Sequence, residues 1–270
     1  MMIDLHCHIL PGLDDGARAL DEALEMARIA VGEGIETIVA TPHLFRGNDL
    51  KDFGDIDERR KELNGALVGQ NIQLEIKLGA EVHVSHFLID ALQKSRNRLV
   101  LNGSSYMFVE FPQDHVYRAA QNLFFEVMNE GIIPIIAHPE RNIVFGQNPG
   151  LLYDLVQQGA LVQVNSGSLT GIYGRQPYEA VLRLIGWDLV HFIASDGHDP
   201  RSIPPRLAEA AKKAEVLAGK ETARALVRDN PQAVLEDREV PYLPVSKDPR
   251  KSRKSFSIRI PRIFKNLGKN

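Results

Sequence analysis

The chain has 270 residues, of which 44% are hydrophobic and 25% are charged, a composition that fits one large soluble domain with a sizeable core. Its apolar runs are short and broken by charges, and no basic region precedes the first of them, which argues against a membrane span and a signal peptide. A single cysteine excludes internal disulfides and fits a cytoplasmic, reducing location.

Strand-like and helical patterns alternate along the chain. We predict strands at residues 2–7, 35–41, 74–81, 106–111, 132–138, 161–165 and 190–196. Helices are predicted at 20–32, 55–68, 85–95, 115–129, 149–158, 176–185 and 219–229, with more helix after 205. Seven units of this kind predict an α/β fold in which parallel strands close into a barrel, and an open doubly wound sheet is the alternative.

Glycines mark the predicted junctions between helices and strands. Gly34, Gly131, Gly159 and Gly186 each come shortly before an apolar, β-branched run, as expected where a helix ends and a strand begins. The spacing from Gly131 to Gly159 is 28 residues and from Gly159 to Gly186 is 27, which suits one strand–helix unit.

The charge of the chain is divided unevenly. Residues 247–270 contain nine Lys or Arg and one acidic residue, a net charge of +8, which leaves −11 for the rest of a chain whose total is −3. From Pro241 onward the composition shifts to Pro, Ser, Lys and Arg. We therefore predict one domain over residues 1–240 and a basic, flexible or amphipathic tail over residues 241–270.

Potential metal ligands follow most of the predicted strands. His6 and His8 are two residues apart, so on a strand their side chains point to the same side. The other candidates near strand ends are Asp15, His43, Glu81, Glu110, His138, Asp196 and His198. Any one of them could be an ordinary structural residue, and Asp14-Asp15-Gly16 alone would predict a turn. Their repetition at the edge where parallel α/β folds form active sites favours a shared site.

This set of imidazoles and carboxylates, almost without thiol, indicates a site for Mn²⁺, Fe²⁺ or Zn²⁺. Nine candidate ligands exceed the needs of one ion, so we expect two or three ions, with Mn²⁺ preferred. Such a site generates hydroxide at neutral pH and binds both the attacking and the leaving oxygen, chemistry that favours hydrolysis of a phosphoester. His83, His86, His115 and His191 show no such pattern and are expected to be surface or supporting residues.

The segments DLHCHILPGLDDGA, ATPH, GAEVH, VEF, AHPER and SDGH, in this order, resemble the PHP (polymerase and histidinol phosphatase) superfamily. They are most similar to the bacterial PHP-type protein tyrosine phosphatases of capsule and exopolysaccharide operons, over about residues 2–240. The resemblance implies a distorted seven-stranded (β/α)₇ barrel that holds three metals. It implies one metal on His6, His8, Glu81 and Asp196, a second on Glu81, Glu110 and His138, and a third on Asp15, His43 and His198.

The resemblance also implies arginines that bind the substrate phosphate. Arg141 matches the arginine after the fifth strand, and a planar guanidinium suits a phosphate with two free oxygens. The family's second arginine would fall near Ile203, so Arg201 or Arg206 is expected to take its place, with Arg201 preferred. A metal, water or a protonated histidine, for which His43 is the candidate, would assist the phenolate leaving group.

The thiol-based mechanism of tyrosine phosphatases does not fit this chain. It requires an arginine six residues after the cysteine, and Leu13 occupies that position relative to Cys7, which we expect to pack in the core. We therefore predict a metal-dependent protein tyrosine phosphatase that acts on a tyrosine kinase of polysaccharide synthesis. The alternatives are a small-molecule phosphatase such as histidinol phosphatase, and a non-catalytic module that binds phosphotyrosine or the kinase.

The basic tail has its own pattern. Ile260, Ile263, Phe264 and Leu267 follow a helical spacing among Lys and Arg residues. This pattern predicts a short amphipathic helix, and residues 250–270 could hold the protein at the inner face of an anionic membrane. A disordered tail, or one that docks on the acidic body, is the alternative. Nucleic-acid binding is not expected, because the body is acidic and the tail offers no folded basic surface.

Overall fold

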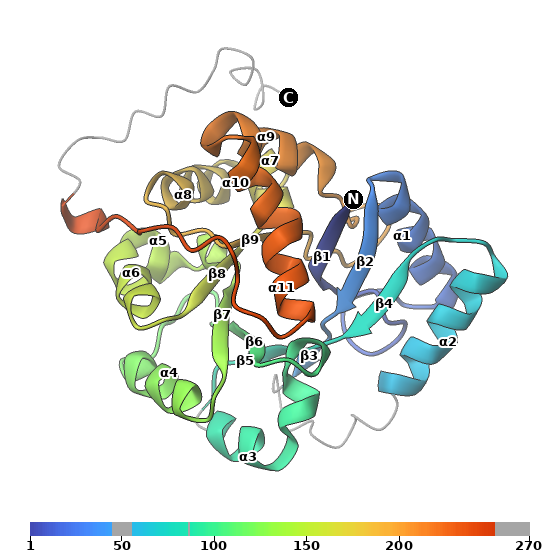
Figure 1. Ribbon diagram of the computed structural model, residues 1–270, viewed down its shortest axis with the longest axis horizontal. Helices are drawn as coiled ribbons and strands as arrows, with labels where there is room; N and C mark the ends of the chain where they lie inside the picture. Colours follow the sequence, from blue (N-terminus) through green and yellow to red (C-terminus); the bar gives the residue numbers. More distant parts are fainter. Residues whose placement is uncertain (45–55, 86, 252–270) are drawn as a thin grey trace.

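The computed structural model describes residues 1–44, 56–85 and 87–251, in which parallel strands are surrounded by helices (Figure 1). The strands are β1 (Met2–Cys7), β2 (Ile35–Ala40), β3 (His43–Leu44), β4 (Glu75–Leu78), β5 (Glu81–His83), β6 (Tyr106–Glu110), β7 (Ile133–Ala137), β8 (Leu161–Asn165) and β9 (Phe192–Ala194). They form a sheet of order β1-β2-β4 and a sheet of order β3-β5-β6-β7-β8-β9, with every pairing parallel. The predicted α/β fold is confirmed.

Two short breaks divide the strands into these two sheets. Thr41-Pro42 separates β2 from β3, and proline has no N–H for a ladder hydrogen bond. Gly79-Ala80 separates β4 from β5, where a Cβ on Gly79 would lie 2.6 Å from the Leu101 side chain. Hydrogen bonds from Asp196 N to His6 O (2.9 Å) and from His8 N to Gly197 O (2.8 Å) join the end of β9 to β1. Seven parallel stretches, two of them interrupted, thus follow one another in an order consistent with the distorted barrel.

The helices lie outside the strands, with α11 as the exception (Figure 1). They are α1 (Leu20–Gly32), α2 (Ile56–Gly69), α3 (Leu88–Leu99), α4 (Ala120–Asn129), α5 (Ile143–Gln147), α6 (Pro149–Gln157), α7 (Ser166–Thr170), α8 (Arg175–Gly186), α9 (Ala208–Ala218), α10 (Lys220–Arg224) and α11 (Asn230–Leu235). None of these described helices has the length and apolarity needed to cross a membrane. The predicted helices at 85–95 and 115–129 begin later than expected, and the strand predicted at 74–81 is divided into β4 and β5.

The glycine junctions are confirmed at three of four positions. Gly34, Gly131 and Gly159 have φ of 86°, 74° and 113°, the left-handed region that glycine reaches without steric cost. The fourth junction differs, because Gly186 is still the last residue of α8 and Asp188 adopts the left-handed conformation, with φ of 56°. Aspartate tolerates this region better than most side chains.

A small apolar cluster lies within the strands, beneath the candidate site. Its members are Ile3, Leu5, Val39, Leu101, Tyr106, Phe108, Ile135, Ala137, Leu161, Phe192, Ala233, Val234 and Val240. Ala233 and Val234 belong to α11, so this helix covers the amino-terminal side of the strands (Figure 1). At the carboxyl-terminal side of the strands, the centroid of the Phe108 ring lies 4.9 Å from that of the His6 ring. The apolar cluster therefore forms the floor of the polar site.

Residues 241–251 lie against the domain, and the predicted boundary after residue 240 stays a prediction. Asn230 accepts a hydrogen bond from Tyr242 N and donates one to Tyr242 O, and Lys247 N donates to Trp187 O. Arg250 forms an ion pair with Asp154 of α6 at 2.8 Å. The amphipathic pattern at Ile260–Leu267 lies outside the described residues.

His191 is buried, so the expectation of a surface position is wrong for this residue. It precedes β9, its backbone N donates to Val162 O, and its ring Nδ1 accepts a hydrogen bond from Val162 N at 3.1 Å. Nδ1 therefore carries no proton, and the ring is neutral. Burial lowers the pKa of His191 from 6.5 to about 4.

We predict that His191 makes the protein less stable in mild acid. The unfolded chain protonates this ring near pH 6.5 and the folded protein only near pH 4, so the free energy of unfolding falls as the pH decreases between these values. The loss from this residue should reach about 2 kcal/mol at about pH 5. In His191→Asn the amide oxygen can still accept from Val162 N, but the side chain does not titrate. Urea unfolding at about pH 7 and about pH 5 should show a smaller pH dependence for the variant, and an equal dependence would contradict the assignment.

Candidate metal centre

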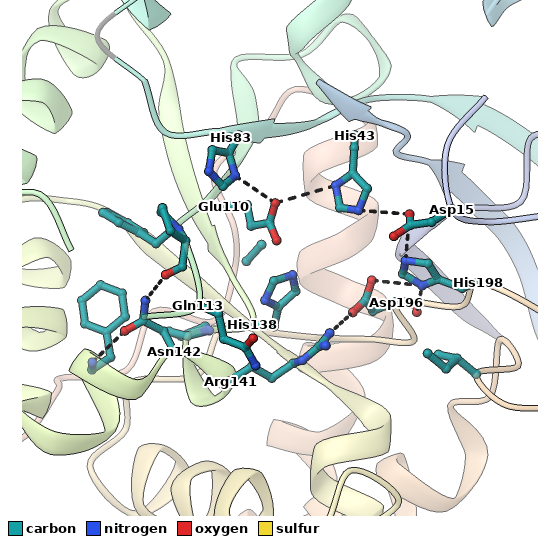
Figure 2. Close-up of a pocket in the computed structure, with 16 residues that line it drawn as sticks. Asp15, His43, His83, Glu110, Gln113, His138, Arg141, Asn142, Asp196 and His198 are labelled. Carbon is teal, nitrogen blue, oxygen red and sulfur yellow. Dashed lines mark hydrogen bonds and ion pairs between the residues drawn. The ribbon is translucent and has the colours of Figure 1, made fainter. Parts of the chain in front are cut away.

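The structure brings all nine predicted ligands together at the carboxyl ends of the strands. A cavity of about 530 Å³ is lined by six of them, namely Asp15, His43, Glu110, His138, Asp196 and His198 (Figure 2). The nitrogen and oxygen atoms of all nine form three groups, each within 4.8 Å. The groups are His6, Glu81, His138 and Asp196; then His8, Asp15, His43 and His198; and finally His43, Glu81 and Glu110. The grouping differs from the predicted one in three ways. His8 joins the group of Asp15, His138 joins that of His6, and His43 takes the place of His138 beside Glu81 and Glu110.

Glu81 lies at the centre of the cluster and is fully buried. Its Oε2 lies 3.3 Å from His6 Nε2, 3.4 Å from His8 Nε2 and 2.9 Å from His43 Nδ1. Its Oε1 lies 2.7 Å from His138 Nε2. Although three ring nitrogens surround Oε2, none of them forms a hydrogen bond of good geometry with it. Three ring nitrogens around an oxygen that has no hydrogen bond of good geometry fit a set of metal ligands.

Neighbouring acceptors turn three of the imidazoles toward the cluster. His6 Nδ1 lies 3.1 Å from Gln163 Oε1, and His8 Nδ1 lies 2.7 Å from Asp14 Oδ2. His198 Nδ1 lies 2.8 Å from the Asp196 carbonyl oxygen. When Nδ1 of a histidine donates to an acceptor, Nε2 keeps its lone pair and faces the other way, which is the arrangement found around protein-bound metals. The residues present therefore fit a metal centre.

The loop after β1 brings Asp14 and Asp15 to the cluster. Asp14 accepts hydrogen bonds from Gly16 N and His43 N, while its Oδ2 holds His8. Gly16 is required here because a Cβ on it would lie 2.0 Å from His8 O. The side chain of Asp15 is 57% exposed, and its Oδ1 lies 3.3 Å from His43 Nε2 and 3.5 Å from His198 Nε2. Asp14 thus holds His8 and the backbone of His43 in place, while the side chain of Asp15 lies on the solvent-exposed side of the cluster.

Glu110 and His83 form the opposite side of the cavity (Figure 2). Glu110 Oε2 lies 3.7 Å from His43 Nδ1 and 3.2 Å from His83 Nδ1. The expected supporting role of His83 therefore has a specific partner. His86 lies outside the described residues, and His115 is exposed beside Tyr117.

Two of the candidate ligands adopt left-handed backbone conformations. His138 has φ of 32° and Asp196 has φ of 54°, and left-handed conformations are uncommon for residues other than glycine. His138 directly follows the end of β7, and Asp196 lies two residues after the end of β9. This backbone conformation directs both side chains into the cluster, and it costs on the order of 1 kcal/mol at each residue.

The clustered carboxylates and imidazoles shift one another's pKa values toward the charged forms. Burial opposes ionisation of Glu81, but the charges of His6 and His138 hold its pKa well below the usual range. Burial also opposes protonation of His138 and His43, yet Glu81 raises the pKa of His138 to about 9, and Asp15 together with Glu81 raises the pKa of His43 to about 9. Hydrogen bonds from His198 and His43 lower the pKa of Asp15. The carboxylates therefore stay ionised, as metal ligands must be.

Arg141 lies at the edge of the cluster, in the 3₁₀ turn η3 (Pro139–Arg141) that follows β7. Its Nη1 donates to Asp196 Oδ2 at 2.9 Å, and its side chain lines the cavity and is 36% exposed. Among the described residues, the lining of this cavity includes neither Arg201 nor Arg206. Ile203 lies there instead, while Arg201 is exposed and Arg206 lines a neighbouring cavity of about 100 Å³.

Sequence reasoning missed the polar residues on β8 that support the site. Gln163 holds His6, and Asn165 Nδ2 donates to Asp196 Oδ2 at 2.7 Å. The available signal was two fully buried polar residues, two positions apart, in the otherwise apolar run LVQVN. The interpretation of Cys7 is confirmed, because it is fully buried in the main apolar core.

Comparisons with known proteins agree with this geometry. The chain is 41% identical to the tyrosine-protein phosphatase YwqE of Bacillus subtilis, over 95% of this chain and 100% of that protein. It is 30% identical to the tyrosine-protein phosphatase CpsB of Streptococcus pneumoniae, over 87% of this chain and 99% of that protein. A crystal structure from work on these two proteins, described as unique metal-dependent tyrosine phosphatases, matches with a TM-score of 0.87 and 40% identity, over 92% of this chain and 99% of the other.

A more distant structural match concerns the fold alone. It is a β-aspartyl dipeptidase of Fervidobacterium islandicum, with a TM-score of 0.51 and 13% identity over 87% of this chain and 74% of the other. The family model that matches is that of capsular polysaccharide synthesis, CpsB/CapC, over residues 2–236. Since this match spans most of the chain, the protein belongs to the CpsB/CapC family.

Proposed function

We propose that this protein is a metal-dependent protein tyrosine phosphatase. The observation that carries the proposal is the clustering of nine imidazoles and carboxylates beside a cavity that six of them and Arg141 line. The identity of 41% with YwqE, over the full length of that phosphatase, supports the same reaction in this chain. Cys7 is buried in the core and its pKa is raised by burial, so it is unsuited to the thiolate chemistry of other tyrosine phosphatases.

We infer that the cluster binds two or three ions, with Mn²⁺ preferred and iron or zinc as alternatives. Nitrogen and oxygen donors suit these metals, whereas a structural zinc site would be expected to contain cysteine thiolates. When bound, the ions would supply a nucleophile at neutral pH and neutralise charge on the phosphoryl group. The ligand sets given by family resemblance remain part of this proposal. The contacts of His43 with Asp15 and Glu81 support a ligand role more than that of a proton donor to the leaving group.

The chain's own contribution to substrate binding is assigned to Arg141. Its guanidinium lines the cavity beside the cluster and offers N–H donors in a planar fork, which matches two oxygens of a phosphate. Asp196 fixes one terminal nitrogen of this fork. Arg141 would thereby orient the phosphoryl group relative to the metals before reaction. The role of Arg201 or Arg206 as a second phosphate ligand is retained as a proposal that requires movement of the loop 199–206.

We further propose that the substrate is a tyrosine kinase of capsule or exopolysaccharide synthesis and that the protein is cytoplasmic. Membership in the CpsB/CapC family of capsular polysaccharide synthesis supports such a partner. The net charge of +8 over residues 247–270 supports contact with an anionic membrane surface, where clustered Lys and Arg are attracted to acidic lipid head groups.

The reaction is tested with a phosphotyrosine peptide, a phosphoserine peptide and histidinol phosphate, each with metal-stripped protein and after addition of Mn²⁺, Fe²⁺ or Zn²⁺. We expect turnover of phosphotyrosine that is lost with chelator and restored by Mn²⁺. A preference for histidinol phosphate would move the protein to the small-molecule phosphatases. No turnover of any substrate, with metal bound, would favour a phosphotyrosine-binding module instead.

Replacement of Arg141 tests the phosphate-binding role. Arg141→Ala should reduce kcat/KM for the phosphotyrosine peptide about 100-fold or more, because it removes charge-assisted hydrogen bonds to the phosphate. Arg201→Ala and Arg206→Ala are the matched comparisons, and a loss in only one of them would identify the second phosphate ligand. Bound metal is measured in each variant, because Arg141 also contacts Asp196. Unchanged kcat/KM in Arg141→Ala with metal retained would contradict the assignment.

The membrane proposal is tested by removing residues 252–270. A chain that ends at Lys251 keeps the ion pair of Arg250 with Asp154, so the domain should be preserved. We expect the full chain, but not the shortened one, to sediment with vesicles that contain phosphatidylserine, and added salt should weaken this binding. Phosphatidylcholine vesicles are the control. Equal sedimentation of both chains would exclude a membrane role for the tail.

A further inference from the structure

Arg141 is held from two sides, by the candidate ligand Asp196 and by Tyr173, which does not line the metal-site cavity. On one side Arg141 Nη1 donates a hydrogen bond to Asp196 Oδ2, and the same oxygen accepts a second hydrogen bond from Asn165 Nδ2 at 2.7 Å. On another side the ring of Tyr173 faces the guanidinium, with Arg141 Cζ 5.2 Å from the ring centroid. A guanidinium at this distance from an aromatic face is stabilised by a cation–π interaction. Tyr173 itself lines the neighbouring cavity of about 100 Å³.

The position of Tyr173 depends on a glycine in the preceding helix. Gly167 lies in the first turn of α7, directly after β8, and a Cβ on it would lie 2.7 Å from the Tyr173 ring. The backbone of Gly167 is not in the left-handed region, so alanine would be allowed there if the ring were absent. Gly167 O also accepts a hydrogen bond from Ile172 N at 2.9 Å, which folds the loop of Tyr173 back over the helix.

The end of β8 therefore organises the whole environment of Arg141. Asn165 N donates to Glu140 Oε1 at 2.8 Å and so fixes the turn that carries Arg141. The Asn165 side chain fixes Asp196, and Gly167, two residues later, makes room for Tyr173. Two hydrogen bonds of Asn165 and the space left by Gly167 thus fix the groups that surround the Arg141 guanidinium.

We propose that Tyr173 is a positioning residue, which holds Arg141 in the orientation that binds the substrate phosphate, and that Gly167 is required because it admits the Tyr173 ring. This inference rests on the proposed phosphatase function. Tyr173 acts through its aromatic face, since burial and the nearby charge of Asp196 raise its pKa and keep the phenol neutral. Its removal leaves Arg141 able to adopt other rotamers, so phosphate binding loses pre-organisation.

The test measures binding of inorganic phosphate to the Mn²⁺-loaded protein by calorimetry, together with metal content and kinetics on a phosphotyrosine peptide. Tyr173→Leu removes the ring, Tyr173→Phe keeps it, and Gly167→Ala displaces it. Gly65→Ala, in the middle of α2 with open space around the added Cβ, is the matched control for a helical glycine. We expect Tyr173→Leu and Gly167→Ala to weaken phosphate binding and raise KM about 10-fold, with metal content unchanged. Tyr173→Phe should stay within about twofold, and Gly65→Ala should have no effect.

A double variant separates a role through Arg141 from general damage. In the Arg141→Ala background, Tyr173→Leu should cause no further loss of phosphate affinity, because the residue on which it acts is absent. Additive losses, or unchanged phosphate affinity in Tyr173→Leu with metal retained, would overturn the proposal. If Tyr173→Leu fails to fold, Gly167→Ala decides the question in the same way. Phosphate binding that follows the expected pattern without phosphotyrosine turnover would sustain this inference while rejecting the proposed function.

Discussion

The structure depends on the burial of several ionisable side chains at one point where water is largely excluded. An isolated buried carboxylate such as Glu81 would be strongly unfavourable, and it becomes tolerable only because His6, His8, His43 and His138 surround it. Removing one partner would leave the others uncompensated. This requirement explains why the nine groups come from strand ends that are distant in sequence but adjacent in the fold.

The apolar interior and the polar site have separate tasks. Phe108 and its neighbours within the strands form a packed floor, closed at the amino-terminal side by α11. Above this floor, supporting residues on β8 and the loop after β1 fix the imidazole rings, with Gln163 holding His6 and Asp14 holding His8. Backbone strain occurs at His138 and Asp196, where it serves to aim ligands, and the surrounding packing and hydrogen bonds maintain it.

Arg141 lies between the candidate metal centre and the cavity. Its environment shows how one segment, the end of β8 with the start of α7, can position both a candidate ligand and the arginine proposed to bind phosphate. Asn165 contacts Asp196 and the turn of Arg141, while Gly167 allows Tyr173 to approach. Because the same carboxylate faces the histidines through Oδ1 and Arg141 through Oδ2, the binding of metal and of phosphate are expected to influence each other.

The alternation of strands and helices and the identity of the nine clustered residues can be predicted from the sequence alone. The local reason is that strand periodicity puts His6 and His8 on one side, and parallel strands bring their carboxyl ends to one edge. The three-dimensional structure was needed to show which candidate ligands lie in one group, that His191 is buried and neutral, and that Ile203 rather than Arg201 borders the cavity. It also showed that Tyr173 lies against Arg141. These relations depend on side chains far apart in the chain, whose contacts are set by packing and not by any local pattern.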